Sequence, residues 1–219
     1  QSVSSVISTE SQVTLRRSTF DHRVIQLSCP GANCAVSQVA LVGSGSQLDA
    51  EDVLILAPTT PTPQGNQLAS INLGGGGPYL LRRVMSTGGF SEGAITIADA
   101  DVSATDLAIH EAKVGLRLNC ARGCAAIELQ RLAVSRATAQ GIVMGGDFRG
   151  TAADLGAYDC SKGISIDGRV GAIDLRRASV VSAGTAEVGL ERTTDSGDPA
   201  SFTAPLRSID LRGPFAIAL

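Results

Sequence analysis

The sequence has little of what marks a nucleic-acid-binding protein or a protein whose ligand pocket is lined by aromatic rings. It contains no Trp, and Tyr and Phe supply only 2 and 5 of its 219 residues. A pocket or sugar platform built from many rings is therefore not expected. Lys and Arg total 18 against 21 Asp and Glu, and this balance excludes a protein that holds nucleic acid through phosphate contacts.

Long apolar runs and helical patterns are also missing. No run of 18 apolar residues occurs, so no membrane span is expected. The chain opens QSVSSVIS, without Met or an apolar leader, as a mature or trimmed chain would. No segment shows a helical stripe over ten or more residues. The 43% hydrophobic content comes mainly from Val, Ile, Leu and Ala, which suits short strands.

Four of the five cysteines fall into two close pairs. Cys29 and Cys34 lie in CPGANC, and Cys120 and Cys124 lie in CARGC. Local disulfides close loops of this kind. Zinc is the alternative, but a zinc site needs about four ligands and neither pair has a nearby His. We expect two disulfides and an extracytoplasmic location: secreted, periplasmic, or on a cell or virion surface. The state of Cys160 is left open.

What the sequence does contain is a repeat. Runs such as AITI at 94, GLRL at 115 and GISI at 163 alternate with period two, as short strands do. The stretch AAIELQRLAVSRATAQGIVM, 125–144, returns 46 residues later as GAIDLRRASVVSAGTAEVGL, 171–190. Glycines begin or precede the runs at steps of 22, 26, 22 and 26, so the pattern repeats doubly every 48 residues. These glycines are Gly93, Gly115, Gly141, Gly163 and Gly189.

A repeat of this length with several short strands is typical of a solenoid. One coil cannot bury its own apolar face, so inward residues must stack on those of the next coil. A β-sandwich has no reason to repeat at a fixed step, and the motif of leucine-rich repeats is absent. We expect an all-β protein: a single right-handed parallel β-helix over residues 1–219, with coils of about 22–26 residues and a Pro- and Gly-rich excursion at about 57–77.

The rhythm of GLRLNCARGCAAIELQRLAVSRATAQGIVM resembles right-handed parallel β-helix proteins of the pectate-lyase-like superfamily. A Gly-Ile-x-Ile run opens a coil, and an Ile-x-Leu strand follows a short turn. The likeness covers about 93–219 well and 1–92 loosely. It implies architecture rather than one chemistry, because this fold hosts lyases, hydrolases, epimerases, phage tailspikes and adhesins. The Asn ladder common in these proteins is missing.

Aligned coils bring Asp and Asn side chains to the points where strands meet turns. Asp99, Asn119, Asp147 and Asp167 fall there, and strands of adjacent coils are about 4.8 Å apart. Enzymes of the resembled superfamily commonly have their active site at such an edge. Asp147 and Asp167 are therefore candidates for a Ca²⁺ site and, with Lys162, for the catalytic residues of a polysaccharide lyase or glycoside hydrolase. The alternative is that Asp and Asn simply suit turns.

Arginine recurs after apolar strands, as at Arg131 and Arg177. With Arg149, these residues are candidates for binding an anionic glycan. The favoured alternative is a solvated, charged face in which acids of the same strands pair with the arginines across coils. These acids are Glu128, Asp174 and Asp210.

A further set of polar residues aligns at a corner. His110 aligns with Tyr158, and Glu111 with Asp159, both at an offset of 48. No Ser or Cys partner for His110 is visible in the sequence, so a hydrogen-bonded structural histidine is favoured over a catalyst.

These features favour a non-catalytic structural or binding module, such as a shaft, an adhesin or a tailspike-like fibre, that meets an anionic glycan or a protein partner. The alternative is a polysaccharide lyase or hydrolase, with Ca²⁺ as its candidate cofactor. The chain ends on the apolar strand FAIAL, and exposed solenoid ends invite strand pairing. We therefore expect a homo-oligomer, such as a trimer, or a longer parent chain to cover that end.

Overall fold

The computed structural model describes residues 2–21, 23, 37–56, 68–90, 93–167, 173–182, 186–193, 206–213 and 215–217. All twelve elements in these residues are β-strands. Their bounds are β1 Ser2–Thr9, β2 Gln12–Asp21, β3 Ser37–Leu56, β4 Leu68–Phe90, β5 Ile95–Ala112, β6 Val114–Ser135, β7 Gln140–Tyr158, β8 Lys162–Asp167, β9 Ile173–Val181, β10 Ala186–Thr193, β11 Leu206–Arg212 and β12 Phe215–Ile217.

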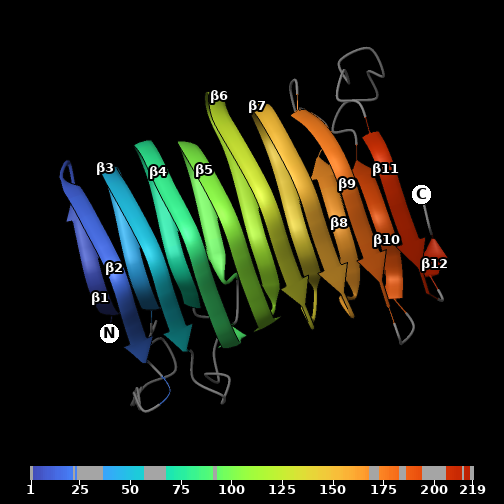
Figure 1. The fold of residues 1–219 in the computed structure, drawn as a ribbon, viewed down its shortest axis with the longest axis horizontal. Helices are drawn as coiled ribbons and strands as arrows, with labels where there is room; N and C mark the ends of the chain where they lie inside the picture. The colour runs from blue at the N-terminus through green and yellow to red at the C-terminus, as the bar shows by residue number, and fades with distance from the viewer. Residues whose placement is uncertain are drawn as a thin grey trace, which may run out of the picture.

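The strands stack coil upon coil in one parallel sheet. Each strand from β3 to β6 pairs with the strand that follows it along most of its length. Beyond Tyr158 the coil is divided between shorter strands, so that β7 pairs with both β8 and β9. Figure 1 shows the stack running in chain order from β1 to β12. The prediction of an all-β, parallel β-helix is confirmed.

One corner of the coil is built from a non-glycine residue in the left-handed region. In Leu129-Gln130-Arg131-Leu132, the two leucines are buried and the two residues between them are exposed. The second exposed residue has a positive φ, and this extra residue bends the strand as a β-bulge does. Eight residues in register along the stack share this conformation, with φ between 47° and 59°. We call them the corner ladder: Arg17, Asp52, Arg83, Asp106, Arg131, Asp154, Arg177 and Ser208.

The ladder explains why the sequence repeats most closely every second coil. Its first seven members alternate between Arg and Asp, and the residue two positions before each alternates between Leu and Ala. A large inward side chain therefore stacks between two small ones, which fills the core without overlap. The alternating inward column is Leu15, Ala50, Leu81, Ala104, Leu129, Ala152 and Leu175.

The predicted inward positions and coil length are confirmed in the centre of the stack. Leu129 and Val134 lie in register with Leu175 and Val180 two coils on, and all four are at most 2% exposed. Ion-paired ladder residues of adjacent coils are 31, 25 and 23 residues apart in chain order. The predicted coil length of 22–26 residues is therefore correct between β5 and β9, whereas the coil from β3 to β4 is longer.

Two details of the predicted pattern were wrong. Gly115, Gly141, Gly163 and Gly189 lie in register, but Ile95 pairs with Leu116 and so places Ala94, not Gly93, in that column. Residues 68–77, which were expected to belong to the excursion at 57–77, lie in β4, which begins at Leu68. Residues 57–67 lie outside the described part of the chain.

Candidate functional site

Ion pairs between adjacent coils connect the corner ladder. The Nε atom of Arg177 lies 2.5 Å from Oδ1 of Asp154, and Nη2 lies 2.7 Å from Oδ2. Arg131 pairs with Asp106 in the same two-pronged way, at 2.6 and 2.9 Å. Arg83 pairs with Asp52 one step nearer the N-terminus. Each of these three arginines therefore binds the carboxylate of the preceding coil through two hydrogen bonds from its planar guanidinium group, here called the arginine fork.

The ladder carboxylates have lowered pKa values. Hydrogen bonds from Arg177 are the main cause for Asp154, and the charges of Arg177 and Arg131 add to them against the opposing effect of desolvation. Asp106 and Asp52 have pKa values lowered in the same way by Arg131 and Arg83. The ionised form of each ladder Asp is thus stabilised by an arginine of the next coil.

Acid should weaken the fold through this ladder. Because the pKa of each ladder Asp is lower in the fold than in the unfolded chain, its stabilising effect is complete above the unfolded value of about 3.9 and is lost as pH falls through the lowered values. We expect the melting temperature, followed by circular dichroism, to fall between about pH 4 and pH 2. A variant with Asn at Asp52, Asp106 and Asp154 should show a shallower fall; parallel curves would contradict this account.

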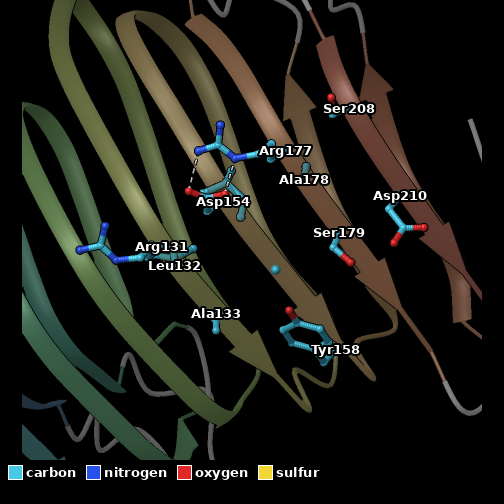
Figure 2. A pocket seen from close by; sticks show the side chains of 12 residues that line it. Arg131, Leu132, Ala133, Asp154, Tyr158, Arg177, Ala178, Ser179, Ser208 and Asp210 are labelled. Carbon is cyan, nitrogen blue, oxygen red and sulfur yellow. Dashed lines mark hydrogen bonds and ion pairs between the residues drawn. The ribbon is translucent and has the colours of Figure 1, made fainter.

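Beside the ladder, the outward face of the coil is hollowed. The hollow encloses about 450 Å³ over β6, β7, β9 and β11. Ala133, Gly156, Ser179 and Asp210 lie in register across it. Its ladder side is lined by Arg131, Asp154, Arg177 and Ser208. Figure 2 shows the Asp154–Arg177 pair on one side and Tyr158 on the other.

Tyr158 places an exposed ring in this hollow. The residue is 40% exposed and, with Met85, is one of two large exposed hydrophobic residues in the described chain. A Cβ atom added to Gly156 would lie 2.6 Å from the ring and hydroxyl of Tyr158, so the ring lies back over the glycine. The other tyrosine, Tyr79, is fully buried and donates a hydrogen bond to the Gly75 carbonyl at 3.0 Å. The low aromatic content predicted no platform of rings, and it gave no sign of this exposed one.

His110 has a serine partner that sequence reasoning did not find. Its Nδ1 lies 2.8 Å from Oγ of Ser135, and its Nε2 lies 3.4 Å from Oε1 of Glu111. The expected alignment with Tyr158 is confirmed, because Ser135 pairs with His110 on one side and Tyr158 on the other. Glu111 also pairs with Arg136 at 3.3 Å. These contacts agree with the favoured interpretation of His110 as a hydrogen-bonded structural residue.

The predicted catalytic and calcium-binding residues fall on several strands. Lys162 begins β8 and Asp167 ends it. Asp147 lies in β7, where Gly145 rather than Asp147 is in register with Asn119. The side chains of Asp147 and Asp167 are outside the described part of the structure. No cluster of His, Cys, Asp or Glu suited to a metal occurs among the side chains that are described. The Ca²⁺ and catalytic roles stay predictions.

At the turn CARGC, residues 121–124 of β6 lie between Cys120, which pairs with Gly146, and Ala125, which pairs with Phe148, so four residues of β6 span the single residue Asp147 of β7. Two acids of the preceding coil hold its ends. Asp99 accepts a hydrogen bond from the Ala121 amide, and Asp101 accepts one from the Ala126 amide, both at 2.7 Å. Asp99 thus bonds the backbone of the next coil rather than that of its own turn.

The arginines proposed to bind an anionic glycan differ in their contacts. The guanidinium groups of Arg131 and Arg177 are hydrogen-bonded to ladder carboxylates. Arg149 is exposed on β7 beside Ala126. The acids expected to pair across coils were wrongly assigned in two cases. Asp174 pairs with Arg176 and Asp210 with Arg212, each two residues away on the same strand. The pairs across coils use the ladder Asp residues and, nearer the N-terminus, Asp49 and Glu51, which pair with arginines of the adjacent coils.

The cysteine predictions stay open. Cys29 and Cys34 lie outside the described residues, and so does the side chain of Cys124. Cys120 and Cys160 are buried, and no disulfide is seen among the described residues. Burial raises the pKa of the Cys160 thiol.

The chain matches none of the protein families, curated proteins and solved structures with which it was compared. The resemblance to the pectate-lyase-like superfamily therefore stays a prediction. In the ranges that the structure describes, there is no helix of the length and apolarity that crossing a membrane requires.

Proposed function

We propose that the protein is an extracytoplasmic structural and binding module, a rigid β-solenoid that presents the hollow beside its corner ladder to an extended glycan. The observation that carries this proposal is the exposed Tyr158 ring lying over Gly156 among paired charges. Rings with an exposed face, set among a few polar groups, are common in ligand sites. Regular strands on either side hold these groups in place, which limits the entropy lost on binding.

Filling the hollow tests this function. Ala133 lies in the hollow, and Ala108 lies next to it in the same outward column but does not line it. Met85 naturally occupies this column one coil earlier, so Met is sterically accepted there. We expect Ala133→Met to weaken binding to immobilised polysaccharides about tenfold or more, and Ala108→Met to leave it unchanged. Equal binding by both variants, or no binding by the wild type, would overturn the proposal.

The same samples test the enzyme alternative. A lyase or hydrolase using Asp147, Asp167 and Lys162 would release unsaturated or reducing products from uronate polymers, with Ca²⁺ as the candidate cofactor. We expect no product with or without added Ca²⁺. Product that disappears in Asp167→Asn would replace the module proposal with the enzyme.

A further inference from the structure

The chemistry of the hollow bears on which class of glycan it takes, and this inference rests on the function proposed above. Two cations and two anions line the hollow: Arg131 and Arg177, and Asp154 and Asp210. The lining charges therefore balance. An anionic glycan would find no excess of positive charge here to attract it.

Each of these charges also has its own partner. Asp154 and Arg177 pair within the hollow, while Arg131 pairs with Asp106 at its edge. Asp210 lies 2.8 Å from Arg212. An anionic ligand would have to displace a carboxylate from an arginine fork. Breaking that ion pair would cost most of the free energy that the new ion pair with the ligand supplies. A neutral ligand can leave the pairs intact.

The paired groups still offer hydrogen bonds to an uncharged ligand. A guanidinium has five N–H donors, and the fork of Arg177 uses Nε and Nη2 toward Asp154. Nη1 keeps its donors, and each carboxylate oxygen keeps acceptor capacity. Ser179 adds a half-buried hydroxyl in the same column as Gly156. Adjacent donors and acceptors of this kind match the hydroxyl groups of a sugar.

The ring of Tyr158 supplies the complementary apolar surface. It lies over Gly156, where a side chain would collide with it, and it is 40% exposed. A pyranose has C–H groups on its faces and hydroxyls around its rim. Stacking one face on Tyr158 would direct the rim toward Ser179 and, across the hollow, toward the Asp154–Arg177 pair, which Figure 2 shows on the side opposite the ring.

We propose that the hollow beside Tyr158 is a subsite for one uncharged pyranose ring of a glycan. The ring stacks on Tyr158, and its hydroxyls hydrogen-bond to Ser179 and to the paired Asp154 and Arg177. Selection against anionic sugars follows from the pairing of every charge that lines the hollow.

Isothermal titration with the intact chain tests the subsite. The probes are a panel of neutral hexasaccharides of different linkage, hexagalacturonate as the anionic counterpart, and adenosine as a planar aromatic ligand. We expect at least one neutral hexasaccharide to bind, with an affinity that changes little between low and high salt. Tyr158→Ala should weaken it about tenfold, because ring stacking contributes up to about 1.5 kcal/mol.

Two control variants separate stacking from folding. Tyr158→Phe keeps the ring and should stay within about threefold of the wild type. Met85→Ala removes the other large exposed hydrophobic side chain, outside the hollow, and should bind normally. Undisturbed binding by Tyr158→Ala would overturn the subsite.

The probes also distinguish this inference from the proposed function. Tighter, salt-sensitive binding of hexagalacturonate would overturn the uncharged subsite and leave the glycan-binding module standing. Binding of adenosine alone, or of none of the probes, would overturn both.

Discussion

Replacing Gly150 with Ala is expected to destabilise the protein by more than about 4 kcal/mol or to prevent it from folding. Gly150 lies in β7 in register with Ile127, and its φ is 137°. An added Cβ would lie 1.8 Å from the Ile127 carbonyl oxygen. That oxygen belongs to the backbone of the adjacent coil, so the steric clash could be relieved only by separating the paired strands β6 and β7 at this point.

Gly74→Ala is the matched control. Gly74 also lies in a long strand, but an added Cβ would meet only the Ala98 carbonyl oxygen, at 3.8 Å. Because its φ is outside the left-handed region, Ala should change stability by less than about 1 kcal/mol. Urea unfolding followed by circular dichroism measures both variants. Equal midpoints for the two would show that adjacent coils are not packed at Gly150 as described.

The second large effect is expected in the alternating core column. Leu129 is 1% exposed and lies between Ala104 and Ala152. Leu129→Ala would put three alanines in succession, with no large neighbour in the column to fill the space. We expect a loss of about 4 kcal/mol, toward the upper end for buried Leu→Ala changes, because a cavity that cannot collapse costs most.

The converse change and an exposed neighbour make this prediction specific. Ala152→Leu would stack three leucines and should cost about 1–3 kcal/mol through overpacking. Gln130→Ala, on the exposed side of the same corner, should stay within about 0.5 kcal/mol of the wild type. Denaturant midpoints that rank these variants differently would contradict the alternation of large and small residues.

Sequence reasoning could predict the fold because the inward residues repeat. Pairs such as Leu129 and Leu175 recur with the same type at two-coil spacing, and the structure places them in one column. The reason for the double spacing was not visible. Arg131 and Asp154 differ in size and charge, so the repeat alone does not reveal that they occupy equivalent corners of adjacent coils.

A signal for the corner ladder was nevertheless present. Fragments such as LRRV, ATDL, LQRL and AADL share an apolar residue, two outward positions and a second apolar residue. Period-two alternation breaks at each of them, and that break marks the left-handed residue. Ser135 follows His110 by 25 residues, the offset of Arg131 from Asp106, so the same register would have revealed the partner of His110.

The hollow could not be predicted in the same way. It depends on the ring of Tyr158 lying back over Gly156, and no repeat encodes a side-chain rotamer. Counting aromatic residues treated Tyr79 and Tyr158 alike, whereas one is fully buried and the other exposed. The low aromatic content therefore could not indicate which of the two rings is exposed.

Tyrosine fluorescence offers the most direct test of the central claim, that the hollow at Tyr158 binds an uncharged glycan. The chain has no Trp and only 2 Tyr, and Tyr79 is buried, so a ligand in the hollow should change emission from Tyr158. Titration with the neutral hexasaccharides should give a saturable change in the wild type that is absent in Tyr158→Phe. Emission that stays constant while binding is detected, or changes equally in both proteins, would contradict the account.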